Sequence, residues 1–125
     1  MFNILVVEDD KNTRLLMEAV LKQYGYNPIL AADGEDALEI MDHKHVDLVL
    51  LDVMMPRMDG YTATREIRTL SNNRKANIPI VAMTANAFEE DRRKAFECGM
   101  NGHIVKPIDM ESIAEILDQI FNEVR

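Results

Sequence analysis

The sequence has a single cysteine, Cys98, which excludes an internal disulfide framework. Its place in the helical pattern KAFECGM favours a small buried residue, and we assign it no chemical role. No apolar run approaches the ~20 residues that a membrane span needs. No basic, apolar and small-residue leader precedes the first strand pattern, which begins at Phe2, so the expected location is the cytoplasm.

Positive charge is also scarce, with 14 lysines and arginines against 22 aspartates and glutamates and a net charge of −8. The summed field would repel a phosphate backbone, so direct binding of nucleic acid is not expected. With 125 residues, of which 47% are hydrophobic and 29% charged, the chain is long enough for one domain with its own core. We therefore predict one domain over residues 1–125.

Five short runs rich in β-branched residues alternate with segments whose apolar residues recur at spacings of three and four. The predicted strands are Phe2–Val7, Pro28–Ala31, Val46–Leu51, Ile78–Met83 and His103–Val105. The helical segments are marked by Leu16/Val20/Tyr24, Ala37/Leu38/Met41, Thr64/Ile67/Arg68 with Leu70, Phe88/Ala95/Phe96 and Met110/Ile113/Leu117/Ile120/Val124, with a polar loop at Ser71–Lys75. Because strands and helices alternate and the third strand is apolar on both faces, the pattern predicts a doubly wound α/β domain: a five-stranded parallel sheet with five helices.

Polar side chains follow four of these strands. They are Glu8, Asp9 and Asp10 after the first strand, Asp52 after the third, Thr84 after the fourth and Lys106 after the fifth. Ligands of open parallel sheets bind outside the carboxyl ends of the strands, so we expect these groups to converge on one edge. Taken singly, each also fits an ordinary role: Asp10 an N-cap, Thr84 a turn or cap, and Lys106 a surface lysine.

Carboxylates crowded within a few ångströms raise one another's pKa unless a cation offsets their charge. Oxygen ligands with room for water suit Mg²⁺, or Mn²⁺ in its place. An aspartate can act as a nucleophile and form an acyl phosphate, while a cation, an ammonium and a hydroxyl balance the charge of the transferred group. The pattern therefore favours Asp52 as an acceptor of a phosphoryl group.

An ordered set of motifs lies at these positions: Glu8-Asp9, Asp52 with MMPRMDG behind it, Thr84-Ala85 and Lys106-Pro107. The set resembles the receiver domain of two-component response regulators, including the chemotaxis regulators, over essentially the whole chain. This resemblance implies a flavodoxin-like receiver fold with strand order 2-1-3-4-5. It also implies that the chain takes part in a phosphorelay, in which Asp52 receives phosphate from a phosphohistidine of a partner histidine kinase or histidine phosphotransfer domain.

The resemblance assigns the metal to Asp9 directly, Glu8 mainly through water, Asp52, and the backbone carbonyl of Met54. Lys106 would contact the phosphoryl group, with the bond to Pro107 typically cis. Such a domain catalyses only its own phosphorylation and slow dephosphorylation.

The switch of the family joins Thr84, which would swing its hydroxyl toward the phosphate, to a ring at the position of His103. The two would shift the face made by the fourth helix, fifth strand and fifth helix. The family usually has Tyr or Phe where this chain has His103. Imidazole is smaller and can titrate, so a weaker or pH-sensitive switch and a passively exposed side chain are both open readings.

The residues two past the acceptor and two past the threonine, Met54 and Asn86, influence autodephosphorylation across the family. Met54 offers no polar group to orient the attacking water. We therefore expect a phosphorylated state that lasts minutes or longer.

Three other functions fit the residues less well. An aspartate-nucleophile phosphohydrolase commonly has Asp-x-Asp after its first strand, where this chain has Glu8-Asp9-Asp10. A flavin or nucleotide module needs a Gly-rich or Ser/Thr-rich phosphate loop there. A module that only docks partners would lack one of the four residues Asp9, Asp52, Thr84 and Lys106, and none is missing.

The segment Pro79–Ile108 resembles receivers attached to hybrid sensor histidine kinases more than those that precede DNA-binding effectors. A free-standing regulator and a receiver within a larger protein both fit the sequence. The expected partners are a kinase or phosphotransfer domain and an attached or separate output, and phosphorylation-dependent homodimerisation through the fourth and fifth helices is compatible with the family.

Overall fold

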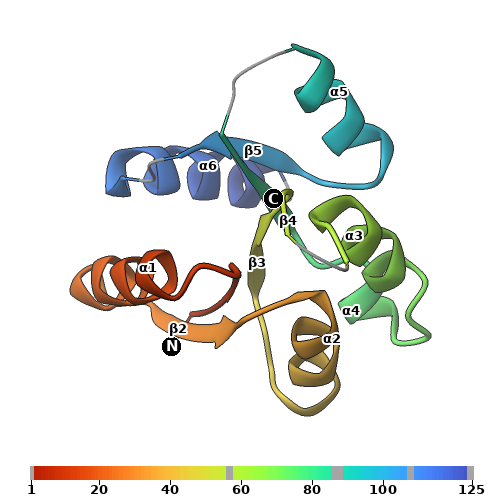
Figure 1. Cartoon of the computed structure of the whole chain (residues 1–125), viewed down its shortest axis with the longest axis horizontal. Helices are drawn as coiled ribbons and strands as arrows, with labels where there is room; N and C mark the ends of the chain where they lie inside the picture. The colour runs from red at the N-terminus through yellow and green to blue at the C-terminus, as the bar shows by residue number, and fades with distance from the viewer. Residues whose placement is uncertain (1, 56–57, 86–88, 107–108, 124–125) are drawn as a thin grey trace.

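The computed structural model describes residues 2–55, 58–85, 89–106 and 109–123 (Figure 1). Its centre is a parallel sheet of five strands in the order β2-β1-β3-β4-β5. The strands are β1 Asn3–Val7, β2 Asn27–Ala31, β3 Leu48–Asp52, β4 Ile80–Thr84 and β5 Gly102–Val105. The predicted class and strand order are confirmed. No end of a predicted strand differs from the observed end by more than two residues.

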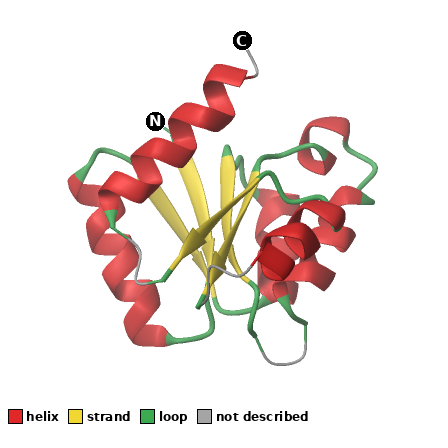
Figure 2. Ribbon diagram, turned by 90° about the horizontal axis from the view of Figure 1, so that it is seen from above, coloured by secondary structure: helices red, strands yellow, loops and turns green. Residues whose placement is uncertain are grey.

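Helices cover both faces of the sheet, as Figure 2 shows. They are α1 Lys11–Gln23, α2 Gly34–His43, α3 Gly60–Arg68, α4 Asn73–Ala76, α5 Glu89–Glu97 and α6 Met110–Glu123. None of the helices in the described ranges is long and apolar enough to cross a membrane. The five longer helices are those predicted, and α4 is an additional single turn.

Side chains of each strand alternate between two cores, because successive residues of a strand point to opposite faces. Leu5 and Val7 pack with α2, α3 and α5, whereas Ile4 and Val6 pack with α1 and α6. All five residues of β3 are buried, including Asp52. A strand that is buried on both sides holds its last residue rigidly, and this is the position that Asp52 occupies.

Asparagine or aspartate caps begin five of the helices. The side chain of Asp10 accepts a hydrogen bond from a backbone N–H in the first turn of α1, and equivalent bonds begin α2, α3, α4 and α6 at Asp33, Asp59, Asn72 and Asp109. Each cap satisfies a backbone donor that the helix itself leaves unpaired. The caps therefore fix where the chain leaves each strand and starts the next helix.

Some of the apolar residues that mark the helical segments do not face the core. In α1, Leu16 and Tyr24 are 61% and 58% exposed, and Met17 and Leu21 face the core instead. In α5, Phe96 is 53% exposed, and Ala95 is the buried residue. Both helices carry apolar residues on more than one face, so spacing alone does not identify the face that packs.

The segment Ser71–Lys75, predicted as a loop, contains most of α4. The Asn72 side chain accepts a hydrogen bond from Lys75 N at 3.1 Å, and Ala76 N donates to Asn72 O at 2.9 Å. A capping asparagine thus folds one helical turn from a segment without apolar spacing.

Arg68, at the end of α3, contacts two connections that are distant from each other in sequence, from α4 to β4 and from α5 to β5. Its guanidinium donates twice to Gly99 O at 2.7 and 2.9 Å, and once each to Ala76 O, Ile78 O and the Asn101 side chain at 2.7–2.9 Å. Burial lowers the pKa of this guanidinium, which has carbonyl and amide partners rather than a carboxylate. Arg68 therefore acts as a structural clamp at the amino ends of β4 and β5.

We expect Arg68→Met to lower the free energy of unfolding by about 2–4 kcal/mol, because several carbonyl groups lose a charged donor. Chemical denaturation monitored by circular dichroism measures this change. Arg65→Met, on an exposed position of the same helix, is the matched control and should stay within about 0.5 kcal/mol of wild type. Equal stability of the two variants would contradict the clamp.

Candidate functional site

Asp52 ends a strand that is buried at every position, and the residue is 3% exposed. Met54 N donates a hydrogen bond to Asp52 Oδ1 at 3.0 Å, which fixes the rotation of the carboxylate. The chain then returns as α3, whose first residue, Gly60, lies against the strand end. A Cβ atom at Gly60 would be 2.5 Å from Asp52 O and 2.7 Å from Val53 Cα, so only glycine permits this approach.

Three carboxylates meet at the carboxyl ends of β1 and β3. Glu8 and Asp52 are buried and Asp9 is exposed, and each offers an oxygen such that the three atoms lie within 4.8 Å of one another. The predicted convergence of these acids is thus what the geometry shows. Asp10 points elsewhere: its side chain caps α1 by accepting from Thr13 N at 2.9 Å and Thr13 Oγ1 at 2.6 Å.

The ammonium of Lys106 lies between the two buried carboxylates. Its Nζ is 2.7 Å from Glu8 Oε2 and 3.0 Å from Asp52 Oδ2. Burial alone would lower the pKa of Lys106, but the hydrogen bonds and charges of Glu8 and Asp52 outweigh it and raise that pKa. Lys106 is therefore held as a cation, and it reaches the site from the edge strand β5.

Burial has the opposite consequence for Glu8, whose side chain is almost fully enclosed. Desolvation is the largest cause that raises the pKa of Glu8, and the nearby charge of Asp52 adds to it. The hydrogen bonds from Lys106 and from Asp10 N, the latter at 3.2 Å, offset only part of this rise. The site thus holds more negative charge than the ammonium of Lys106 balances.

Thr84 and His103 are on the neighbouring strands β4 and β5. Thr84 is 3% exposed at the last position of β4, and its carbonyl accepts a hydrogen bond from Lys106 N at 2.7 Å. His103 pairs in register with Ala82 on β4 and is half-buried, with an Nε2 atom that has no hydrogen-bond partner in the described part of the chain. Asn86 and Pro107 lie outside the described residues.

Arg14 is a site residue that the sequence did not indicate. From α1 its Nη1 donates to Glu8 O at 2.8 Å and to Asp9 O at 3.1 Å, which fixes the backbone of the loop that carries both acids. Helical spacing places Arg14 one turn into α1 but gives no direction for its guanidinium. An arginine one turn after an acidic strand end is the signal that could have suggested it.

The donor set fits a small divalent cation. All three groups are carboxylates, which suit hard ions such as Mg²⁺ and Mn²⁺. Asp9 is exposed, so the cluster is open to solvent on one side and has room for water ligands. A cation there would complete the charge balance that Lys106 begins.

Residues 4–118 match the family model described as the response regulator receiver domain. Among curated relatives, the sensor histidine kinase RcsC of Escherichia coli K12 is 38% identical over 122 residues, which cover 98% of this chain and 12% of that protein. The probable transcriptional regulator ycf27 of Porphyridium aerugineum is 36% identical over 121 residues, which cover 97% of this chain and 48% of that protein. The chain therefore spans less than half the length of either relative.

Solved structures show the same similarity. The chemotaxis protein CheY4 of Vibrio cholerae superposes with a TM-score of 0.87 at 27% identity, covering 96% of this chain and 98% of that one. The receiver domain of the sensor histidine kinase PA1611 of Pseudomonas aeruginosa PAO1 superposes with a TM-score of 0.83 at 38% identity, covering 94% and 95%. That structure has a magnesium ion coordinated in its active-site cleft.

We expect Asp9→Asn to stabilise the metal-free protein by about 1 kcal/mol, or about 3–5 °C in Tm, because it removes one of three crowded charges at little cost in burial. Addition of Mg²⁺ should raise the Tm of wild type more than that of the variant. Differential scanning calorimetry in metal-free and Mg²⁺ buffers measures both effects.

Glu39→Gln, an exposed change of equal charge in the middle of α2, is the matched control and should alter neither quantity. A lower Tm for metal-free Asp9→Asn, or an undiminished response of that variant to Mg²⁺, would show that the three carboxylates do not act as one repulsive cluster.

Proposed function

The chain belongs to the response regulator receiver domain family of two-component phosphorelay signalling, and from this membership we propose that residues 1–125 form a receiver domain whose Asp52 is phosphorylated. The observation that carries the assignment of Asp52 is its setting. It is a buried carboxylate at the end of a rigid strand, held by Met54 N on one oxygen and by Lys106 on the other. Such a fixed carboxylate is suited to nucleophilic attack.

In the proposed reaction, a carboxylate oxygen of Asp52 attacks the phosphorus of a phosphohistidine on a partner. The oxygen–phosphorus bond forms as the phosphorus–nitrogen bond breaks, and the electron pair of that bond leaves with the partner's imidazole, which takes up a proton. Glu8, Asp9, Asp52 and the backbone carbonyl of Met54 would hold Mg²⁺ or Mn²⁺, which neutralises charge on the phosphoryl oxygens when bound.

Lys106 already touches Asp52, so its ammonium needs only a small movement to contact an oxygen of the new phosphoryl group. Thr84 would supply its hydroxyl from the neighbouring strand end, and the bond from Lys106 to Pro107 would be cis as in the family. His103 would move together with Thr84 and so shift the face formed by α5, β5 and α6. These are the fourth helix, fifth strand and fifth helix of the sequence prediction.

The partners follow from the same chemistry: a histidine kinase or phosphotransfer domain as donor, and an attached or separate output. Relatives of both kinds, a sensor kinase and transcriptional regulators, are compatible with either architecture. The net charge of −8 disfavours nucleic acid as a direct ligand. A cytoplasmic location, phosphorylation-dependent homodimerisation and catalysis limited to its own phosphorylation and dephosphorylation complete the proposal.

We expect incubation with acetyl phosphate and Mg²⁺ to give a base-labile phosphoryl adduct by intact-protein mass spectrometry. The adduct should be absent in Asp52→Asn and reduced to a trace when Mg²⁺ is withheld, because the nucleophile or the charge balance is then lost. Glu39→Gln should be modified like wild type. A folded wild type that binds Mg²⁺ without modification would direct the assignment to a module that only docks partners. An adduct on Asp52→Asn would show that another residue is the acceptor and would refute the assignment of Asp52.

We expect the phosphorylated protein to persist for minutes or longer, because Met54, which is 74% exposed beside Asp52, offers an attacking water no strong hydrogen bond from its side chain. Met54→Asn should shorten the half-life by about threefold to tenfold by orienting that water. The apolar control Met54→Leu should leave the half-life unchanged. The half-life is measured from the loss of the adduct mass after acetyl phosphate is removed. A wild-type half-life of seconds would refute this expectation.

A further inference from the structure

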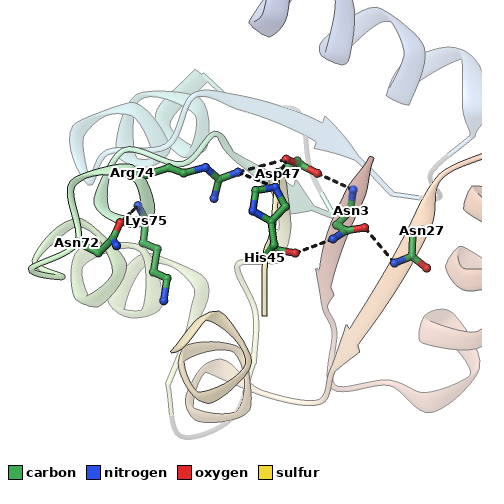
Figure 3. A network of polar contacts seen from close by, with 7 residues as sticks. All are labelled: Asn3, Asn27, His45, Asp47, Asn72, Arg74 and Lys75. Carbon is green, nitrogen blue, oxygen red and sulfur yellow. Dashed lines mark hydrogen bonds and ion pairs between the residues drawn. The ribbon is translucent and has the colours of Figure 1, made fainter. Parts of the chain in front are cut away.

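A cavity of about 310 Å³ lies at the amino ends of the strands, at the opposite edge of the sheet from Asp52. It is formed by the connection from α2 to β3 and by the short helix α4. Its lining residues are Asp42, His43, Lys44, His45, Asn72, Arg74 and Lys75. Figure 3 shows the polar network beside it, in which Arg74 and His45 meet at Asp47.

Positive charge is concentrated around this cavity, although the chain as a whole has a net charge of −8. Lys44, Arg74 and Lys75 contribute positive charges, and His43 and His45 contribute imidazole rings. Asp42 is the one carboxylate in the lining. The local excess of cations is therefore the reverse of the overall balance.

Asp47, next to the cavity, is already occupied by its own partners. Its Oδ2 accepts from Asn3 N at 2.8 Å, and its Oδ1 accepts from His45 Nε2 at 2.8 Å and from Arg74 Nη2 at 3.2 Å. Burial alone would raise the pKa of Asp47, but the Asn3 and His45 hydrogen bonds and the His45 and Arg74 charges outweigh it and lower that pKa. Asp47 thus orients His45 and Arg74. The Asp42 carboxylate lies 3.5 Å from His43 Nδ1, so the ammonium groups of Lys44 and Lys75 have no carboxylate partner among the described residues.

Several N–H donors at the cavity make no hydrogen bond, or only a long one, within the described residues. The Lys44 ammonium has no ion pair or hydrogen bond there, and Lys75 Nζ has only the Asp42 carbonyl at 3.4 Å. Arg74 uses Nη2 alone, and Asn72 uses its side-chain oxygen but not its amide N–H groups. A cavity rich in N–H donors and poor in acceptors suits an anion that consists of acceptor oxygens.

We propose that this cavity binds a small phosphate-bearing anion of the diphosphate class, with Lys44, Arg74 and Lys75 as its principal contacts. The planar guanidinium of Arg74, held in place by Asp47, matches the geometry of phosphate oxygens. The volume is at the lower end for ligand sites, which fits a diphosphate better than a large ligand. This site does not depend on the phosphorylation of Asp52, which lies at the other end of β3.

The test is a titration of ¹⁵N-labelled protein with inorganic pyrophosphate in metal-free buffer at constant ionic strength, followed by NMR. We expect saturable shifts centred on Lys44, His45 and Arg74. The double variant Lys44→Gln/Lys75→Gln should bind pyrophosphate at least about tenfold more weakly than wild type, because it loses two charge-assisted contacts. The matched control Arg92→Gln/Arg93→Gln, which removes the same charge from exposed positions of α5, should bind within about twofold of wild type.

Equal weakening in both double variants would overturn the proposal, because it would reduce the binding to attraction by net charge. Shifts centred on Lys106, an absence of saturation, or equal affinity for sulfate would overturn it as well. Parallel titrations with ADP and orthophosphate distinguish the source of the diphosphate: tighter binding of ADP assigns a nucleotide, and equal affinity for pyrophosphate and ADP assigns the diphosphate group alone. Retained dispersion of the NMR spectra shows that each variant is folded.

Discussion

The ammonium of Lys106 between the carboxylates of Glu8 and Asp52 is the interaction on which the arrangement of the site depends. It joins the ends of three strands, β1, β3 and β5, that are brought together only by the parallel sheet. Two buried carboxylates side by side would otherwise be costly, since removing a charge from water is repaid only by a partner. The ammonium does not contact the third acid, Asp9, which faces solvent. Asp9 can therefore still bind a divalent cation.

The sheet and the helix caps make this arrangement precise enough for chemistry. Asp52 cannot move far, because all of β3 is buried and Gly60 packs directly against the end of the strand. Arg14 holds the adjacent acidic loop through two backbone carbonyls. Rigid support of this kind reduces the reorganisation needed when a reacting group arrives. The repulsion among the acids destabilises the protein, but the buried strand, Gly60 and Arg14 hold the acids in place.

Much of the fold and of the acidic cluster could be predicted from sequence, because the signals are local and the topology is constrained. Alternating strand and helix patterns leave few arrangements, and every strand of a parallel sheet delivers its following residues to the same edge. The failures concern choices that depend on tertiary packing. Apolar spacing in α1 did not reveal that Met17, rather than Leu16, faces the core. The direction of the Arg14 and Arg68 side chains depends on backbone carbonyls from other segments, which no local pattern encodes.

The distribution of charge along the strand direction follows from the same topology. In each strand–helix unit the helix begins at the carboxyl edge of the sheet, so the positive ends of several helix dipoles meet where Asp10, Asp33, Asp59 and Asp109 act as caps. That edge can therefore hold the acidic cluster as well. The helices end at the opposite edge, where their negative ends favour basic residues such as His43 in the last turn of α2. An overall charge of −8 thus conceals two edges of opposite character, one suited to a cation and the other to an anion.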